Sequence, residues 1–304
     1  MIDTQNEQPC WSERYDRDLG DLFAVQDEIT QQITLAMKVH LDDGEMARYR
    51  SVGTSNIKAW ELTLTAIDLS DTYIRHNIPD ACGMMKQALE LEPDYSYAWV
   101  MLAWTWRQEV YSGCESWEDT LSDAEKAVQR ALDMNPDDAA ALNQSGFNYL
   151  LRHDAVKAQE YCRRSIELEP GDAGFQGLMA FTCIFIGNFE QARVHERKRQ
   201  EHCPAMSNWY CLVGGQIEQI DGQLDRPITI YQQGIAAEPD STPCRFYLAN
   251  ALMQKGDTAA AQKLADEIRT LDPSINGCGF VRAYSADPAV RDQFYQHPAH
   301  FGLV

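Results

Sequence analysis

Three residues two-thirds of the way along the chain have side chains that bind transition metals. His195, His202 and Cys203 offer the imidazole and thiolate groups that zinc prefers. The surrounding residues indicate one helix, which would place the two histidines on the same side, two turns and roughly 10 Å apart. That separation is too large for one ion. We therefore predict no metal site, and interpret these residues as two surface histidines and a cysteine at a helix end.

Pairs of acidic residues are a second feature that could support chemistry, either general acid/base catalysis or calcium binding. The pairs are Asp42 with Asp43, Glu118 with Asp119, and Asp137 with Asp138. Each lies at a predicted helix start or loop, where acids cap free N–H groups and favour the helix dipole. We predict that these acids, and the His153-Asp154 turn, serve at helix ends.

No short motif of a known enzyme class is present. The sequence contains no GxxxxGK[ST], GxGxxG, GxSxG or HExxH pattern, so phosphate cradles, nucleophile elbows and zinc-protease sites are unsupported. An enzyme with an undetected site would need a deep pocket with convergent titratable groups. We therefore predict a non-enzymatic chain without catalytic residues, metal or cofactor.

The tryptophans at 99, 104 and 106 could form an aromatic cage for a cation. In the repeat family that the sequence resembles, described below, Trp99 and Trp106 stand at core positions, which makes most of this cluster structural. Trp104 has a different phase and turns away from the next helix.

Composition restricts the class of partner. The 304 residues include 46 acidic and 26 basic side chains, for a net charge of −20, which disfavours direct binding to nucleic acid or anionic membranes. No run approaches the roughly 20 apolar residues of a membrane helix, and the first residues carry no signal peptide. Nine cysteines without a CxxC pair indicate a reducing compartment. We predict a cytoplasmic protein that binds proteins or small molecules.

A repeated proline divides most of the chain into units of similar length. It occurs at Pro93, Pro136, Pro170, Pro204, Pro239 and Pro273, separated by 43, 34, 34, 35 and 34 residues. Small residues recur twelve and five positions before the first three prolines, at Ala81 and Ala88, Ala124 and Ala131, and Ala158 and Ser165. Turn pairs precede the later prolines, at Gly187-Asn188, Asp221-Gly222 and Gly256-Asp257. The pattern predicts two close-packed helices per unit, stacked into a right-handed superhelix with a concave inner face.

At this point the sequence resembles the tetratricopeptide repeat. Residues Trp99, Leu102, Ala103 and Trp106, then Leu142, Gly146 and Tyr149, then Leu248, Ala249 and Leu252 fall on positions typical of that family. We therefore expect an all-α, right-handed solenoid of about six helix pairs over residues 54–273. Two departures are Pro227, which predicts a late or kinked helix, and about nine extra residues around 110–119, which predict a longer helix and loop.

The ends of the chain resemble a more specific group. Residues 11–29 are similar to a segment of large bacterial signalling proteins that joins a TolB-like region to C-terminal tetratricopeptide repeats. We expect residues 1–20 to be an extended remnant of that region, 21–53 a linker helix and 274–304 a C-terminal cap. The resemblance implies a fragment or a shortened gene product, because Met1 falls inside the last TolB-like strand.

The same resemblance implies a signalling pathway but does not imply catalytic activity for this chain. Such proteins begin with a class III adenylate or guanylate cyclase domain, or with a winged-helix DNA-binding domain. No residue here matches the metal or nucleotide motifs of the cyclase. We expect a scaffold that forms the sensory or regulatory region of a cyclase-type protein. The alternative is an effector-binding or self-association domain of a winged-helix transcription regulator.

The resemblance also implies which side chains face the concave groove. By phase from each proline they are Tyr97, Trp104, Arg107, Gln108, Asn143, Phe147, Phe181, Phe185, Asn208, Gln219, Phe246, Asn250 and Gln254. Aromatic and amide side chains suit an extended or helical peptide, and few basic groups are present to hold a terminal carboxylate. We therefore predict a protein or peptide ligand in the groove, possible homo-oligomers, and no direct contact with nucleic acid or membrane.

Overall fold

The computed structural model describes residues 54, 56–71, 77–111, 117–204, 207–220, 222–240 and 242–273, together with 294 and 300. These residues form twelve α-helices and no strand. The predicted extended segment at 1–20 and linker helix at 21–53 lie outside the described residues. The predicted cap at 274–304 does too, apart from Phe294 and His300.

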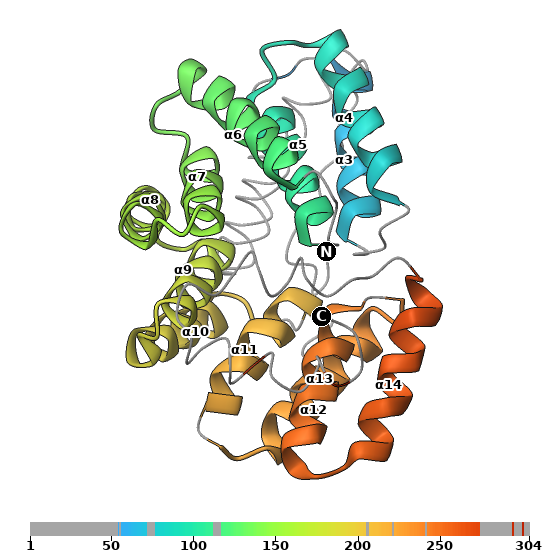
Figure 1. The fold of residues 1–304 in the computed structure, drawn as a ribbon. Helices are drawn as coiled ribbons and strands as arrows, with labels where there is room; N and C mark the ends of the chain where they lie inside the picture. The colour runs from blue at the N-terminus through green and yellow to red at the C-terminus, as the bar shows by residue number, and fades with distance from the viewer. Residues whose placement is uncertain are drawn as a thin grey trace, which may run out of the picture.

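The helices follow one another as six side-by-side pairs (Figure 1). They are α3 (Ile57–Asp71) with α4 (Ile78–Leu91), α5 (Ser96–Tyr111) with α6 (Trp117–Met134), α7 (Ala139–Leu151) with α8 (Ala155–Leu168), α9 (Ala173–Phe185) with α10 (Phe189–His202), α11 (Asn208–Ile220) with α12 (Asp225–Ala237), and α13 (Pro243–Lys255) with α14 (Thr258–Leu271). The pairs run along a curved path, from α3 and α4 at the upper right of Figure 1, through α7 and α8 at the left, to α13 and α14 at the lower right. The predicted all-α solenoid is confirmed.

Small side chains allow the two helices of a pair to approach closely. The predicted small residues Ala81, Ala88, Ala124, Ala131, Ala158 and Ser165 are all 0% exposed. Between α7 and α8 the approach is closest at Gly146, where an added Cβ would lie 2.6 Å from Cys162 Sγ. No larger side chain fits there without a shift of the backbone or the thiol. The recurring small residues are therefore explained by helix packing.

Acidic and amide side chains cap several helices, as the sequence indicated. Ala141 N–H donates to Asp138 Oδ1 at the start of α7, at 2.9 Å. Lys157 N–H donates to Asp154 at the start of α8, at 3.1 Å. These bonds satisfy N–H groups that have no partner within the helix.

The two departures in the repeat are absorbed locally. Helices α5 and α6 have 16 and 18 residues, against 13 or 14 in α4 and in α7 to α14, so extra residues of the long first unit extend that pair. Pro227 lies in the first turn of α12, where its missing N–H costs no helical bond. Helix α12 begins fourteen residues before Pro239, whereas α10 and α14 each begin fifteen residues before the next repeated proline. Helix α12 therefore starts one residue late, as predicted from Pro227.

The fourth pair has an arginine where the first three pairs have a small residue. Arg199 stands five positions before Pro204, the place of Ala131 and Ser165 in earlier units, and is 0% exposed. Its Nε lies 3.1 Å from both carboxylate oxygens of Glu196, its Nη2 2.8 Å from Oε1, and its Nη1 2.7 Å from the Cys203 carbonyl oxygen. A buried guanidinium is tolerated here because its donors meet a carboxylate and a helix-end carbonyl.

Buried apolar side chains of the described residues form three clusters, two of which share contacts with Trp99 and Trp106. One joins α3, α4 and the first half of α5, and a second joins α5, α6 and the start of α7. The third and largest is built mainly from α7 to α14, and it includes Phe294, whose ring centroid lies 6.2 Å from that of Tyr247. None of the described helices has both the length and the apolar character needed to cross a membrane.

The turn between α7 and α8 contains a residue in a costly conformation. His153 has φ = 61°, whereas the equivalent turns place glycine in this region, with φ of 72° at Gly187 and Gly222 and 90° at Gly256. A left-handed conformation costs about 1–2 kcal/mol for a residue with a Cβ, and part of that cost is offset by the greater freedom of glycine in the unfolded chain. We expect His153→Gly to raise the free energy of unfolding by about 0.5–1 kcal/mol in urea denaturation.

The reverse substitution at an equivalent turn provides the control. Gly187→Ala introduces a Cβ at φ = 72° and is expected to lose about 1 kcal/mol. A His153→Gly protein less stable than the parent would show that the exposed imidazole contributes more than the backbone strain costs.

Candidate functional site

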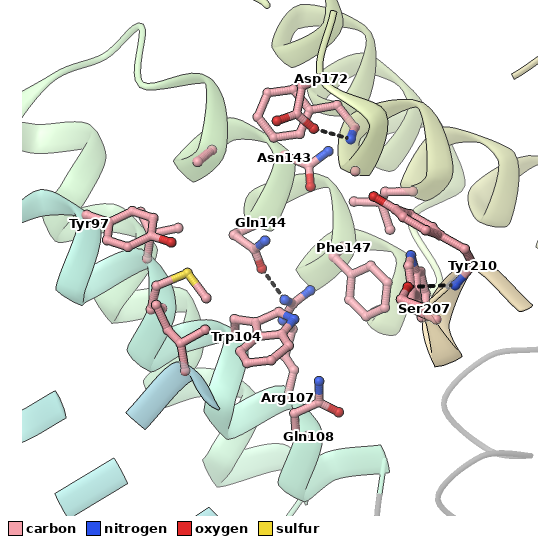
Figure 2. Close-up of a pocket in the computed structure, with 18 of the residues that line it drawn as sticks. Tyr97, Trp104, Arg107, Gln108, Asn143, Gln144, Phe147, Asp172, Ser207 and Tyr210 are labelled. Carbon is pink, nitrogen blue, oxygen red and sulfur yellow. Dashed lines mark hydrogen bonds between the residues drawn. The ribbon is translucent and has the colours of Figure 1, made fainter. Parts of the chain in front are cut away.

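A cavity of about 480 Å³ opens between the first helices of successive pairs (Figure 2). Most of its wall comes from α5, α7 and α9 and from the N-terminal end of α11. Its lining residues are Ile67, Tyr97, Val100, Met101, Trp104, Arg107, Gln108, Ala140, Asn143, Gln144, Phe147, Glu169, Asp172, Gly174, Phe175, Leu178, Ser207, Trp209, Tyr210 and Glu238. The volume is in the range that holds a few side chains of a ligand.

Six of these lining residues are aromatic, and several are fixed by ring contacts. The Trp209 indole lies edge-on to Phe147, with centroids 6.2 Å apart, and edge-on to Phe181 at 4.8 Å. Phe147 and Phe181 stack at 5.8 Å. Because rings packed in this way lose little freedom when a ligand binds, they are suited to act as binding surfaces.

The cation in the cavity wall is held by its neighbours. Arg107 is 3% exposed, and its Cζ lies 4.2 Å from the centroid of the Phe147 ring. Its Nη2 donates to Gln144 Oε1, as Figure 2 shows. The guanidinium therefore links α5 to α7 and gives that part of the wall a fixed shape.

Three carboxylates line the cavity as well. Glu169 and Asp172 belong to the turn between α8 and α9, and Glu238 follows α12. Asp172 Oδ1 accepts from Phe175 N–H at 2.8 Å and so caps α9. In the view of Figure 2, Asp172 lies at the top, and Trp104, Arg107 and Gln108 lie lower.

Tyr210 connects the cavity to the buried arginine of α10. Arg199 Cζ lies 4.4 Å from the centroid of the Tyr210 ring, which fixes the ring in the wall. Burial, together with the nearby Cys203 and Asp172, raises the pKa of Tyr210. Its hydroxyl is therefore protonated at neutral pH and available as a hydrogen-bond donor.

Only some of the residues assigned to the groove from sequence line the cavity. Tyr97, Trp104, Arg107, Gln108, Asn143 and Phe147 line the cavity. Phe181, Phe185, Phe246 and Asn250 are buried, and the three phenylalanines belong to the largest apolar cluster. The side chain of Asn208 lies outside the described part of the chain.

Two further predicted groove residues form a polar link within the solenoid. Gln219 Nε2 donates to Gln254 Oε1 at 3.0 Å, which joins α11 to α13. Gln219 Oε1 accepts from the buried Tyr231 hydroxyl at 3.0 Å. These amides therefore hold neighbouring pairs together in the structure.

Sequence reasoning missed the wall made by turns and first helical turns. Glu169, Asp172 and Glu238 lie beside the repeated prolines, and Phe175, Trp209 and Tyr210 lie just after the turns. The signal was present in the acidic residue that recurs next to the prolines. Assigning groove residues by their phase along the first helix of each pair does not find these acids, because they lie in turns, outside the helical period.

His195, one of the residues considered for metal binding, has a structural contact instead. His195 Nδ1 lies 2.8 Å from Gln176 Oε1, and burial together with nearby Lys198 lowers the pKa of His195. Among the residues that the structure describes, no three His, Cys, Asp or Glu side chains are arranged to hold a metal ion. The described cysteines are free thiols, and burial raises the pKa of Cys82 to about 12.

Comparisons with known proteins identify the fold. No family model matches the chain. TTC0263, a thermophilic tetratricopeptide repeat protein of Thermus thermophilus, is 17% identical; the alignment covers 67% of this chain and 99% of that chain, with a TM-score of 0.50. A tetratricopeptide repeat protein from Parabacteroides merdae is also 17% identical, over 75% of this chain and 84% of that one, with a TM-score of 0.46. The fold is a solenoid of the tetratricopeptide type.

One curated protein has similarity at the level of sequence. Putative adenylate cyclase 3 of Rhizobium meliloti (strain 1021) is 35% identical over 103 residues. The match covers 34% of this chain and 18% of that protein.

Proposed function

We propose that this chain is a non-enzymatic protein-interaction module that binds a segment of a partner protein in the cavity. The observation that carries the proposal is the 480 Å³ cavity between α5, α7, α9 and α11, with six aromatic side chains in its wall. Aromatic side chains with fixed orientation are the commonest anchors of protein interfaces. The volume suits several ligand side chains, so the bound segment contributes a short stretch of residues to it.

The polar groups of the cavity support a binding role. Asp172 caps α9, Arg107 bonds to Gln144, and Tyr210 lies against Arg199. Each group is thereby held in one orientation, which gives the wall a fixed pattern of donors and acceptors. Such a pattern provides specificity for the ligand rather than chemical turnover.

We further propose that the module is the sensory or regulatory region of a cytoplasmic, adenylate cyclase-type signalling protein. The support is the 103-residue similarity to a putative adenylate cyclase, together with the resemblance of residues 11–29 to a segment of bacterial signalling proteins. This match favours the cyclase setting over the winged-helix alternative. Translating the genomic DNA upstream of the Met1 codon tests it: an in-frame cyclase domain is the expected result, and an in-frame winged-helix domain would contradict it.

The binding proposal predicts a large effect at Trp104. Peptides that bind the full chain can be selected from a random display library and measured by titration calorimetry. Trp104→Ala removes a half-buried aromatic side chain of the wall, and truncating an anchor of this kind costs about 2 kcal/mol or more, near thirtyfold in affinity. We therefore expect peptides that bind the cavity to bind the Trp104→Ala protein about thirtyfold more weakly than the parent.

The matched control is Val156→Ala on α8. Val156 is 77% exposed and does not line the cavity, so its truncation should leave affinity within about twofold. Circular dichroism melts verify that both variants fold. If every selected peptide binds the Trp104→Ala protein as well as the parent, the cavity is not the binding site.

A further inference from the structure

We propose that the cavity selects a lysine or arginine side chain of the bound peptide, held between aromatic rings and next to three carboxylates. This inference rests on the proposed function and adds the chemistry of the ligand. It follows from the charges in the wall and from the aromatic rings and apolar side chains that line the same cavity.

The first observation is the balance of charge. Glu169, Asp172 and Glu238 contribute three carboxylates to the lining, and Arg107 contributes the single cation among the described lining residues. The guanidinium of Arg107 already stacks on Phe147 and bonds to Gln144. Among the described lining residues, carboxylates therefore outnumber cations, and the chain as a whole carries −20. A concave negative surface attracts cationic ligands and accelerates their association.

The second observation is the position of the carboxylates. Asp172 is close enough to Tyr210 to contribute to its raised pKa, and Glu238 contributes in the same way at Cys211, the next residue along α11. Acids from two different turns therefore lie around the N-terminal end of α11. Asp172 caps α9 through Oδ1, but a carboxylate has about four acceptor positions and can also receive a ligand N–H.

The third observation is the kind of wall between the charges. Trp104 and Trp209 both line the cavity, and indole rings bind cations best among the aromatic side chains. The chain itself uses this contact, with Arg199 over Tyr210 at 4.4 Å and Lys86 over Trp106 at 5.4 Å. Lysine and arginine also need apolar surface for their aliphatic stems, which Val100, Met101 and Leu178 provide.

A ligand with the opposite charge fits the wall poorly. A terminal carboxylate or a phosphorylated residue would face Glu169, Asp172 and Glu238, and like charges in a partly desolvated site are strongly unfavourable. The same carboxylates that attract a cation therefore also exclude acidic segments.

The test begins with peptides from a random library selected on the full chain, counter-selected against the Trp104→Ala protein so that cavity binders remain. We expect these peptides to be enriched in lysine or arginine. Replacing that residue by glutamine in a selected peptide should lower its affinity at least tenfold, the size expected for a lost hydrogen bond to a charged group.

Variants of the protein test the carboxylates directly. The triple variant Glu169→Gln, Asp172→Asn and Glu238→Gln keeps side-chain size and keeps an N-cap acceptor at residue 172. It should lose at least tenfold affinity for the cationic peptide and lose clearly less affinity for the glutamine-substituted peptide. The control triple, Glu160→Gln, Glu167→Gln and Glu190→Gln, removes the same charge from exposed positions on α8 and α10 and should change affinity less than threefold. The three substitutions of each triple variant are also tested singly. Any single variant with the melting temperature of the parent reports on its own carboxylate.

The outcomes separate this inference from the proposed function. Cavity-dependent peptides without enrichment of cations, or peptides rich in acids, would overturn the inference while the binding function stands. Selected peptides that all ignore Trp104→Ala would contradict the proposed function itself. Equal losses in the two triple variants would assign the effect to net charge rather than to this cavity, and would also overturn the inference.

Discussion

Replacing Arg199 by alanine is expected to lower the free energy of unfolding by about 3–5 kcal/mol, as measured by urea denaturation. The side chain is 0% exposed and makes four contacts of 3.1 Å or less, three with Glu196 and one with the Cys203 carbonyl. Its removal leaves the Glu196 carboxylate, itself 5% exposed, in the protein interior without its cation. Most of the expected loss is the cost of that buried charge.

A double variant separates the buried charge from the lost packing. Arg199→Met with Glu196→Met replaces the ion pair by apolar side chains, which is often close to neutral in stability. We expect the double variant to lose less than Arg199→Ala alone. Arg164→Ala is the surface control, because the Arg164–Asp137 pair is largely exposed and such pairs contribute about 0–1 kcal/mol. An Arg199→Ala protein no less stable than the Arg164→Ala protein would contradict this account.

The second large effect is expected at Gly215, in the middle of α11. An added Cβ there would lie 2.2 Å from Cε1, 2.6 Å from Cζ and 2.7 Å from Cδ1 of Tyr231. The Tyr231 ring is 0% exposed, and its hydroxyl donates to Gln219, so it cannot move without losing that bond. We expect Gly215→Ala to lower the free energy of unfolding by about 3 kcal/mol, at the upper end of overpacking effects.

The same substitution in another helix should have the opposite sign. An added Cβ at Gly83, inside α4, would meet nothing within 4 Å. Alanine is there expected to stabilise by about 0.5–1 kcal/mol, through its higher helix propensity alone. Thermal and urea unfolding of the two variants compare them directly. A Gly215→Ala protein at least as stable as the parent would show that Tyr231 adjusts at little cost.

The sequence was sufficient for the fold because the repeat is local. Prolines at fixed spacing end each second helix, and small residues such as Ala124 and Ala131 mark where helices touch. Each of these features depends only on adjacent helices, so the helix pair of one unit can be predicted from the residues of that unit alone. Arg199 shows the limit: it stands where earlier units have a small residue, and the period predicts neither its ion pair with Glu196 nor its contact with the ring of Tyr210.

The cavity was harder to predict because burial depends on several pairs at once. Helical phase assigns Trp104 and Gln219 equally to the inner face, yet the first lines the cavity and the second bonds to Tyr231 and Gln254. Phase says which side a residue faces, whereas the neighbours that cover it come from other units. The acids of the turns were missed for the same reason, since Glu169 and Glu238 are far apart in sequence and share one cavity.

The division of the apolar interior into three clusters has a mechanical consequence. In a solenoid each repeat contacts only its neighbours, so its curvature is set where one cluster meets the next, and here those junctions fall at α5 to α7. The cavity has α5, α7 and α9 in its wall and so spans the same junctions. A peptide bound there would contact helices on both sides of these junctions and would fix the curvature of the solenoid. The curvature in turn sets the distance between the first and last helix pairs.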